Sequence, residues 1–561
     1  MYYRRQPEAD RRMIRVGLLI DAWTVPAWVH KVVSDIQSSS IAKVVLVVKN
    51  ETASEPPKSF WQKIWSRRRE LIYLIYKKID DSKNRVEPDA FKPVSLKPLV
   101  SDCSVISLTP QKEKHRDYFR DEDAQAILRH DLDVALRFGF NILMGKALEI
   151  ARHGVWSYHH GDNRTHRGGP AGLWEVLEGV PVTGSMLQVL TPELDNGKIL
   201  YRSWAATDPF SARKNRNNYY WKSSAFVMRK LQNLAQGREK NLVVESPNSV
   251  YRPYSGRLYK TPRNQEMVRL LGGLVRRYAQ DRIQQLFSRE QWFVAFRIQE
   301  KQPGPDEAFH RFTPLFPPKD RFWADPFPVQ RDGTYFVFIE EYLEKKKKGH
   351  ISVIEIDREG NGSLPVKVLE RDYHLAYPFV FEWKDEFFMI PETSNNRTVE
   401  LYRSVKFPHE WTLEKVLMTD VNAVDATLAE LEGRWWLFVN LAETEGNVKN
   451  WDELFLFYSE SPLGPWKPHT ANPVKSDVRS ARPAGRIFSR QGHFYRPSQD
   501  SSGRYGHVLC LNEIQRISPT EYEEREVSRI FPRWREGLLA NHTLNCVGGL
   551  TVIDGLFRRA R

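Results

Sequence analysis

Cysteine is scarce in this chain of 561 residues, which contains only three. Cys103, Cys510 and Cys546 lie far apart and form no CxxC pair. This spacing excludes a disulfide scaffold and a cysteine-rich zinc site, and it is typical of a protein in a reducing compartment. The sequence therefore predicts no metal site and no disulfide framework.

Long apolar runs are also missing. No segment approaches the roughly 20 apolar residues that a membrane-spanning helix needs. The first residues, MYYRRQPEADRRMIRVGLLID, are too polar for a signal peptide, so we expect a cytoplasmic protein. Hydrophobic residues make up 41% of the chain and aromatic residues 12%, which excludes a disordered or collagen-like protein. At roughly 100–200 residues per domain, the length predicts several domains.

The charge balance favours anionic partners. The net charge is +14, which suits nucleic acid, phosphorylated substrates or an acidic membrane surface without choosing among them. Residues 60–78, FWQKIWSRRRELIYLIYKK, place aromatic and basic side chains at helical spacing. This helix either packs its aromatic face on its own domain or lies on the inner face of a membrane.

The first 300 residues alternate short β-branched runs with helical stretches. We expect buried strands at 15–21, 43–49 and 131–137, with a helix between the first two. Such alternation is typical of an α/β domain with a parallel sheet, whose ligand site lies at the carboxyl ends of the strands. The predicted domain covers residues 13–205 with an insertion at about 52–95, and residues 206–285 follow as a helical extension and connector.

After residue 305 a unit of short strands recurs, each copy pairing a polar-to-apolar strand with an aromatic one. The copies begin at Asp325, Tyr377, Asp425, Arg482 and His542. A period near 50 residues, with about four strands in each unit, is typical of a β-propeller. We therefore predict a five-bladed propeller over residues 286–561, closed from its N-terminal side by the strand 291–297. The expected fold class is thus multidomain, an α/β domain followed by an all-β propeller.

The strongest chemical signal lies in residues 154–200. A predicted strand, 155–158, leads His159 and His160 into a glycine-rich loop that also carries Arg167. A second strand, 185–190, is followed by Asp195. A histidine and a carboxylate that orients it form an acid–base pair, and arginine suits an anionic group.

This segment resembles the folate-dependent formyltransferases, the superfamily of methionyl-tRNA, glycinamide-ribonucleotide and sugar-amine formyltransferases. The family carries Asn-x-His, then Arg-Gly, a Gly-Glu-x-x-Thr-Gly turn and Leu-Asp-x-Gly. Here the corresponding positions are Ser157-Tyr-His159, Arg167-Gly168, the turn 179–184 and Leu194-Asp195-Asn-Gly197. The resemblance covers residues 13–205 and implies a Rossmann-like fold, 10-formyltetrahydrofolate as cofactor, and His159 and Asp195 as catalytic residues.

The same resemblance assigns the cofactor pocket. Phe138, Gly139 and Phe140 are similar to the family's hydrophobic loop beside the pterin, and Arg167 and Gly168 complete the implied cofactor site.

Ser157 departs from the family, which has an asparagine here that hydrogen-bonds the formyl oxygen. A hydroxyl still donates, but it is shorter and reaches differently. Three alternatives follow: Asn163 or His160 takes over the polarising role, the reaction is altered, or catalysis is lost.

The repeated half resembles arabinanase- and xylosidase-type glycosidases, and more closely the N-terminal domain of plant glucosamine inositolphosphorylceramide transferases. The second likeness is carried by Trp323-Ala-Asp-Pro-Phe327, Tyr377-Pro378, Asp425-Ala-Thr427 and Ala481-Arg-Pro-Ala-Gly485. In such folds the first residue of each inner strand points into an axial funnel. The implied funnel residues are Asp325, Tyr377, Asp425, Arg482 and His542, with Glu392 and Glu513 as further candidates.

A glycosidase of this kind needs suitably placed carboxylates on the first three blades. The second blade supplies Tyr377 instead, so we expect this funnel to bind carbohydrate rather than to hydrolyse it. The alternative is that these polar residues fasten the blades together, as Asp325 before a proline does in many turns.

The leading hypothesis is an enzyme that formylates the amine of an amino sugar, nucleotide- or lipid-linked, in glycan or glycoconjugate biosynthesis. The first alternative is a glycosidase or glycosyl-transfer protein with a degenerate formyltransferase domain, and the second is a non-catalytic glycan-binding protein. We do not expect a nucleic-acid partner. The tRNA enzyme of the family carries a small β-barrel after its catalytic domain, and nothing after residue 205 has that pattern.

Overall fold

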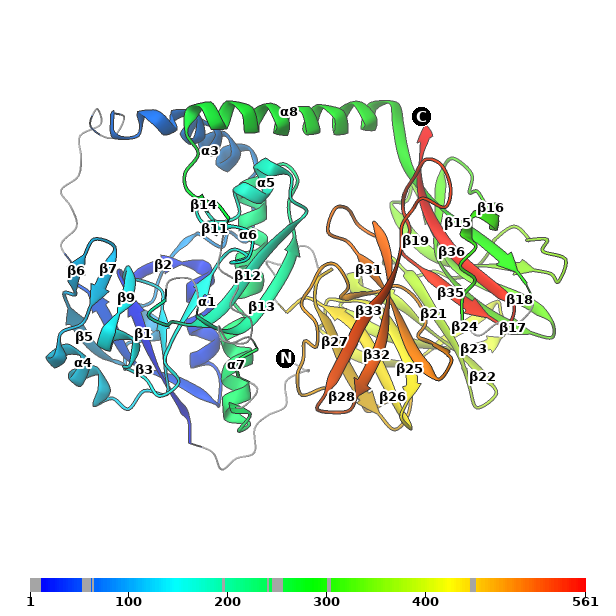
Figure 1. Cartoon of the computed structure of the whole chain (residues 1–561). Helices are drawn as coiled ribbons and strands as arrows, with labels where there is room; N and C mark the ends of the chain where they lie inside the picture. Colours follow the sequence, from blue (N-terminus) through cyan, green and yellow to red (C-terminus); the bar gives the residue numbers. More distant parts are fainter. Residues whose placement is uncertain are drawn as a thin grey trace. The chain divides into compact units, whose positions relative to one another are not determined.

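The computed structural model describes residues 12–52, 62, 65–193, 197–239, 242–244, 256–299, 304–443 and 451–561. Contacts within the chain separate an N-terminal unit, Gln6–Tyr278, from a C-terminal unit formed by Ala279–Ala442 and Lys449–Arg561 (Figure 1). Among the described residues, no helix is both long and apolar enough to cross a membrane.

The N-terminal unit is built on a seven-stranded sheet of order β13-β12-β10-β8-β1-β3-β5. Its strands are β1 Ile14–Ile20, β3 Ala42–Asn50, β5 Ser104–Leu108, β8 Val134–Arg137, β10 Val155–His159, β12 Val182–Val189 and β13 Lys198–Ala206. The first five are parallel, and β12 and β13 add an antiparallel edge. The predicted parallel α/β domain is therefore confirmed, with strand ends that differ from the prediction by at most three residues.

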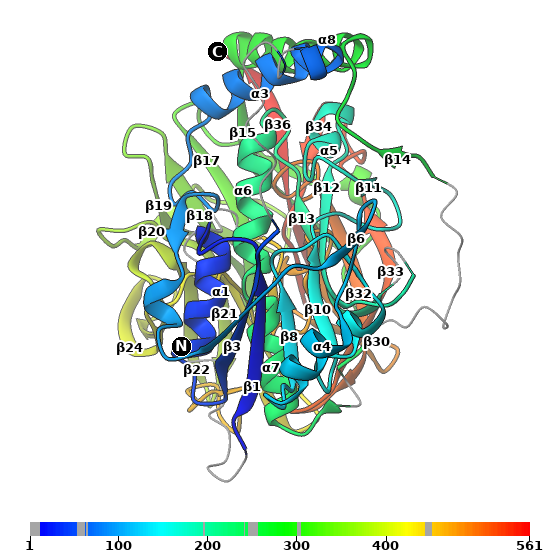
Figure 2. The same cartoon turned by 90° about the vertical axis from the view of Figure 1, so that its left-hand side faces the viewer.

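Helices cover both faces of this sheet, which explains its continuous apolar strands. The covering helices are α1 Ala27–Gln37, α6 Ala212–Ser223 and α7 Phe226–Ala235 on one face and α4 Asp121–Leu128 on the other, whereas α3 Leu71–Lys83, α5 Trp174–Glu178 and α8 Asn264–Phe287 share a separate cluster. On one face Val33 of α1 and Leu231 of α7 pack against Leu18, and on the other face Ile127 of α4 belongs to the cluster around Leu19. Figure 2 shows α1 and α7 along the sheet. The short strands are β2 Thr24–Pro26, β4 Pro93–Ser95, β6 Gln111–Glu113, β7 Arg116–Tyr118, β9 Ile142–Met144, β11 Arg167–Gly168 and β14 Leu258–Tyr259.

The sheet order fixes where a ligand site can form. From β1 the chain adds β3 and β5 on one side, and it then returns to place β8 and β10 on the other side. Between β1 and β8 the direction of winding reverses. In open α/β sheets, ligands bind at the carboxyl ends of the strands beside such a point.

The C-terminal unit is propeller-like and consists of separate antiparallel sheets that follow one another along the chain. Three of them have four strands each. The first contains β17 Arg321–Arg331, β18 Thr334–Leu343, β19 Lys348–Ile356 and β20 Val366–Leu369, and the second contains β21 Ala376–Trp383, β22 Glu386–Thr393, β23 Thr398–Lys406 and β24 Glu410–Thr419. The third contains β25 Ala423–Leu431, β26 Arg434–Leu441, β27 Leu454–Ser459 and β28 Lys467–Pro468. A fourth sheet contains β29 Arg482–Pro483, β30 Phe488–Arg490, β31 His493–Asp500, β32 Val508–Ile517 and β33 Tyr522–Ile530.

The last sheet joins the two ends of this unit. It contains β15 Ser288–Ile298, β16 Thr313–Leu315, β34 Leu538–Ala540, β35 Leu544–Val547 and β36 Leu550–Ala560. Strands β15 and β36 pair antiparallel from Ser288 opposite Ala560 to Ile298 opposite Leu550. The predicted closing strand, 291–297, is confirmed as part of β15.

Two-residue turns explain the hairpins that the sequence repeats indicated. Asp332 and Gly333 connect β17 to β18 with φ angles of 51° and 81°, and Glu432 and Gly433 connect β25 to β26 with 52° and 70°. Positive φ at both central residues matches the right-handed twist of the flanking strands. Two of the four-stranded sheets thus begin with a tight hairpin at these turns.

Candidate functional site

Ser157 and His159 lie at the carboxyl end of β10, one strand away from the reversal point of the sheet. Side chains alternate along a strand, so these two project from one face and Tyr158 from the other. Ser157 is buried and His159 half-buried. The structure therefore brings together the two residues that the formyltransferase resemblance placed in the first motif.

Arg137, at the end of β8, is a site residue that the sequence analysis missed. It lies opposite Ser157 in the parallel register, and its Nη1 donates to Ser157 Oγ at 3.1 Å. Its Nε and Nη2 donate to the backbone oxygen of Asn141 at 3.1 and 2.8 Å. A cationic donor thus contacts the position where the family has asparagine. The sequence did offer one signal for this residue, because Arg137 is the charged end of an otherwise apolar strand.

Gly161 allows the loop after β10 to pass close to the imidazole of His159. A Cβ at this position would lie 3.3 Å from His159 Nε2 and 3.1 Å from the backbone oxygen of His166. Such distances are shorter than most Cβ contacts, so a larger residue would push the imidazole or the backbone of His166 by a few tenths of an ångström. The glycine-rich loop noted in the sequence therefore sets the position of His159.

His160 lies in an aromatic cluster. Its ring stacks on Tyr220 at 3.6 Å between centroids, and Trp28 meets it edge-on at 5.2 Å. Its Nε2 lies 3.1 Å from Ser223 Oγ of α6. Burial, with a smaller contribution from His159, lowers the pKa of His160 well below its usual value. The ring is therefore neutral at physiological pH and packs against α1 and α6.

Asn163 and Asp162 are held by Arg202 of β13. Arg202 Nη1 donates to the side-chain oxygens of both residues at 3.1 Å, and its Nη2 donates to Asn163 Oδ1 at 3.1 Å. Arg167 Nε donates to the backbone oxygen of Asn163 at 2.7 Å. Gly168 pairs with Tyr259, and its φ of 107° lets the two backbones approach. These contacts give the loop a fixed conformation.

Phe138, Gly139 and Phe140 follow β8 and pack at the end of β1. A Cβ at Gly139 would lie 2.4 Å from the backbone nitrogen of Asp21, which only glycine avoids. Phe140 is buried against Phe119 at 5.4 Å, and the half-buried Phe138 meets Trp28 edge-on at 5.7 Å. Of this loop, Phe138 is the more exposed aromatic side chain.

Asp195, together with Leu194 and Asn196, lies outside the described residues. Its role as the catalytic carboxylate stays a prediction from the motif.

In the C-terminal unit, three predicted funnel residues share an uncommon backbone conformation. Asp325, Tyr377 and Asp425 have φ angles of 50°, 43° and 54°, each at a bulge in the first strand of its sheet. Positive φ is costly for a residue as bulky as tyrosine and is concentrated at functional sites. All three side chains are buried.

Hydrogen bonds through this region connect different sheets. The backbone nitrogen of Tyr377 donates to Asp325 Oδ2 at 3.2 Å, and Thr427 Oγ1 lies 2.8 Å from the Tyr377 hydroxyl. That hydroxyl also accepts from the backbone nitrogen of Gly485 at 2.8 Å. The predicted residues therefore converge on one centre, as expected of a propeller-like unit, and several of them fasten its sheets together.

Arg482 and Asp425 form a buried ion pair with contacts of 2.5 and 3.1 Å. Glu392, half-buried, lies 3.7 Å from Arg482, whose guanidinium also stands 4.8 Å from the ring of Tyr505. Burial raises the pKa of Asp425 to about 6 against the attraction of Arg482, and Glu392 adds to the rise. A carboxyl group of this kind exchanges a proton near neutral pH.

His542 lies between two carboxylates. Its Nδ1 is 2.6 Å from Asp554 Oδ2 and its Nε2 is 3.5 Å from Asp325 Oδ1. Burial opposes the charged imidazole, but these carboxylates raise its pKa overall. The three side chains offer atoms within 4.8 Å of one another, close enough to hold a metal ion. The sequence analysis did not predict Asp554 as a site residue. Its one signal in the sequence is a carboxylate within an apolar strand.

Half-buried aromatic residues surround this centre and were also missed. Trp292 stacks on His542 at 4.0 Å, Tyr505 meets the same ring edge-on at 5.3 Å, and Trp451 lies 5.3 Å from Tyr505. Glu513 is not part of the group, because it pairs with the exposed Arg525 at 2.7 Å. Aromatic faces beside a few charged groups are typical of small-ligand sites.

Comparisons with known proteins address mainly the C-terminal unit. Residues 316–542 match the family described as glucosamine inositolphosphorylceramide transferase 1, N-terminal. The chain is 40% identical over 210 residues to glucosamine inositolphosphorylceramide transferase 1 of Oryza sativa subsp. japonica, and 36% identical over 219 residues to that of Arabidopsis thaliana. These matches cover 37% and 38% of this chain, and the chain spans 28% of the length of each relative.

Solved structures show weaker likeness to each unit. Glycinamide ribonucleotide transformylase 1 from Symbiobacterium toebii is 14% identical, with a TM-score of 0.28, over 40% of this chain and 89% of its own. A family 117 glycoside hydrolase from Zobellia galactanivorans is 12% identical, with a TM-score of 0.31, over 47% and 90%. Over residues 316–542, and not over the chain as a whole, the protein is thus similar to the N-terminal region of glucosamine inositolphosphorylceramide transferase 1.

Proposed function

We propose that the chain is a transferase of glycan or glycoconjugate assembly, and that its N-terminal unit transfers a formyl group to the amine of an amino sugar. The observation that carries this proposal is the placement of Ser157, His159 and Arg137 at adjacent strand ends beside the reversal point of the sheet. An amide-forming transfer needs donors where the formyl oxygen gains negative charge. An imidazole and a guanidinium suit that task.

When bound, 10-formyltetrahydrofolate supplies the carbon that the amine attacks. Phe138 would hold its pterin, and Arg137 and His159 would donate to the formyl oxygen while the new C–N bond forms. Ser157 orients Arg137 through the 3.1 Å bond, which compensates for the asparagine that the family has here. Asp195 would accept the proton that the amine loses, directly or through a water. The bond between the formyl carbon and N10 of the cofactor would break as N10 takes up a proton, which leaves tetrahydrofolate. Holding both reactants together removes much of the entropic barrier.

The C-terminal unit supplies the acceptor site in this proposal. We infer that its sheets act as the five blades of a propeller, with a sugar held among Trp292, Tyr505 and Glu392. The family that matches residues 316–542 and the similar rice protein are named for glucosamine, an amino sugar, and for inositolphosphorylceramide, a lipid. A glucosamine-bearing or lipid-linked acceptor is therefore the first class to test.

A second candidate function rests on the carboxyl groups of the same centre. The pKa of Asp425 is about 6 and burial raises that of Asp325, so one carboxyl can be protonated while another is ionised. Such a pair can cleave or transfer a glycosyl group. A third candidate function is glycan binding without catalysis. The aromatic side chains around His542 would then bind the glycan, and the protein would catalyse neither formyl transfer nor glycosyl transfer.

The test is calorimetric titration of the full chain with a stable analogue of 10-formyltetrahydrofolate. We expect micromolar binding, about −8 kcal/mol, that is lost in His159→Ala and kept in His115→Ala, a matched change of an exposed histidine in the same unit. No binding by the unaltered chain would overturn formyl transfer. Turnover of chromogenic glycosides that Asp425→Asn abolishes would instead establish the second candidate.

A further inference from the structure

Helix α3 exposes an apolar stripe to solvent. Leu71, Ile75 and Ile79 recur every four residues and are 36%, 59% and 50% exposed. Residues at this spacing lie on one face of a helix. The opposite face is buried through Tyr73 and Asp80. The exposed apolar stripe therefore lies opposite the buried face of the helix and has no covering among the described residues.

Helix α8 repeats this arrangement beside α3. The two helices share a cluster in which Tyr73 of α3 packs with Leu270 and Leu274 of α8, and both views show them side by side (Figures 1 and 2). Away from that cluster, α8 exposes Val268 and Val275 by 59% and 62%. Two neighbouring helices therefore each present large aliphatic side chains to solvent.

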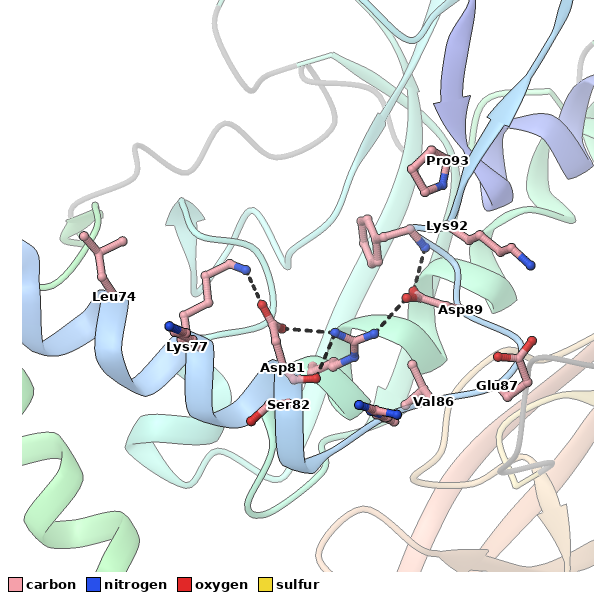
Figure 3. Close-up of a pocket in the computed structure, with 13 residues that line it drawn as sticks. Leu74, Lys77, Asp81, Ser82, Val86, Glu87, Asp89, Lys92 and Pro93 are labelled. Atoms are coloured by element: carbon pink, nitrogen blue, oxygen red, sulfur yellow. Dashed lines mark hydrogen bonds and ion pairs between the residues drawn. The ribbon is translucent and has the colours of Figure 1, made fainter. Parts of the chain in front are cut away.

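A basic pocket of about 840 Å³ opens where α3 ends. It is lined by Leu74, Lys77, Lys78, Asp81, Ser82, Arg85, Val86, Glu87, Asp89, Phe91, Lys92, Pro93 and Arg213 (Figure 3). Five of these side chains are cationic and three are carboxylates, which leaves an excess of two positive charges. The pocket and the exposed stripe are parts of the same helix and the turn that follows it.

The charges in this pocket are unevenly paired. Asp81 contacts Lys77 and Arg213, and Asp89 accepts from Arg213 Nη2 at 2.8 Å. Two of the three carboxylates are therefore neutralised. Within the described part of the chain, the side chains of Lys78, Arg85 and Lys92 make no ion pair or hydrogen bond. Glu87 is the one remaining acid among the lining residues, so these three cations are not balanced.

We propose that α3 and this pocket bind an anionic lipid bilayer. Leu71, Ile75 and Ile79 insert at the level of the headgroups, and Lys78, Arg85 and Lys92 hold a lipid phosphate. Exposed aliphatic residues beside lysine and arginine are what an interfacial helix needs, and each cation near an acidic surface strengthens binding. The overall charge of +14 acts in the same direction. The proposal is independent of formyl transfer, because binding requires neither cofactor nor acceptor.

The test is flotation of the full chain with vesicles of phosphatidylcholine, with and without a quarter of phosphatidylserine or phosphatidylinositol. We expect at least tenfold stronger binding to the anionic vesicles. The triple variant Lys78→Glu, Arg85→Glu, Lys92→Glu should weaken it at least about a hundredfold, since the loss of each cation alone contributes roughly one factor of five. Its matched control changes two exposed lysines and one exposed arginine of the same unit, Lys43→Glu, Lys112→Glu and Arg129→Glu.

The apolar stripe is tested separately with Ile75→Ser, Ile79→Ser. Its control is Val405→Ser, Leu413→Ser, two exposed aliphatic residues of the C-terminal unit. We expect about tenfold weaker vesicle binding in the first pair alone. All of the substituted side chains are exposed, so circular dichroism should show unchanged folding in every variant.

Three results would overturn the proposal. They are equal binding to neutral and anionic vesicles, equal loss in the test and control triples, and no vesicle binding at all, as a protein-docking face would give. Soluble inositol phosphate and inorganic phosphate distinguish the source of the phosphate. If these compounds compete with vesicle binding only at millimolar concentration, the bound phosphate belongs to a lipid headgroup. Tight binding of either compound by a chain that does not bind vesicles refutes the bilayer proposal.

Discussion

Replacing Glu524 by glutamine should destabilise the C-terminal unit by about 3 kcal/mol at pH 7. Arg496, buried beside it, donates to Glu524 from Nε at 2.8 Å and from Nη2 at 2.7 Å. Burial opposes the carboxylate, but Arg496 and then Lys475 lower the pKa of Glu524 to about 2. From the ordinary value of 4.5, this shift of about 2.5 units corresponds to roughly 3 kcal/mol. Removing one partner of a buried pair independently predicts about 3–5 kcal/mol.

The sign of the pH dependence follows from the lowered pKa. The contribution of Glu524 is complete above pH 4.5 and is lost as the pH falls toward 2. The difference between the unaltered chain and Glu524→Gln should therefore shrink to about 2 kcal/mol at pH 3.5. Thermal unfolding at pH 7 should show a midpoint lower by roughly 6–12 °C for a unit of this size.

The neighbouring residue supplies the control. Glu523 lies on the same strand but is 57% exposed and pairs with an Arg516 that is 68% exposed. Exposed pairs contribute about 0–1 kcal/mol, so Glu523→Gln should change the midpoint by no more than roughly 4 °C. Equal effects of the two substitutions, or a difference that does not change with pH, would refute the reasoning.

Three further predictions concern the N-terminal unit. Gly161→Ala places a Cβ 3.3 Å from His159 Nε2. In calorimetry it should weaken binding of a folate analogue at least tenfold, while the midpoint of thermal unfolding changes little. Unchanged affinity would contradict the position assigned to the His159 imidazole. Because the pKa of His160 is lowered in the folded chain, the unfolded chain takes up a proton at this residue first as the pH falls below 6.5. The free energy of unfolding should therefore fall by up to about 1.4 kcal/mol per pH unit in that range. In denaturant titrations at several pH values, His160→Gln should lack this pH dependence. Burial lowers the pKa of Lys230 to about 8, so holding this side chain charged at pH 7 costs roughly 3 kcal/mol of folding free energy. Lys230→Met should therefore raise the midpoint of thermal unfolding. A lower midpoint would disprove this reasoning.

The strands of both units could be predicted because each is a local pattern. The run 15–21 is continuously apolar, as a strand covered on both faces must be, and it forms β1 at Ile14–Ile20. The repeated hairpins were visible because two-residue turns require particular residues, such as Asp332 and Gly333. Both signals lie within a few residues of sequence, where a pattern carries the information.

The site was only partly predictable because its contacts are not local. Arg137 and Ser157 meet through the register of two parallel strands, and nothing in either segment alone specifies that pairing. Asp554 reaches His542 from the opposite strand of a hairpin, and Asp325 is more than 200 residues away from both. Tyr377 was singled out from the sequence, but its positive φ, which lies at the bulge of its strand, could not be predicted from its own preference.

The central claim is that the N-terminal unit forms an amide from a formyl group and an amine. The most direct measurement is mass spectrometry of amino-sugar acceptors, glucosamine and its lipid-linked forms first, after incubation with the full chain and 10-formyltetrahydrofolate. The account predicts acceptor heavier by one formyl group, formed by the unaltered chain and by His115→Ala but not by His159→Ala. An acceptor that stays unmodified although the chain binds the folate, or one that His159→Ala modifies equally well, would contradict it.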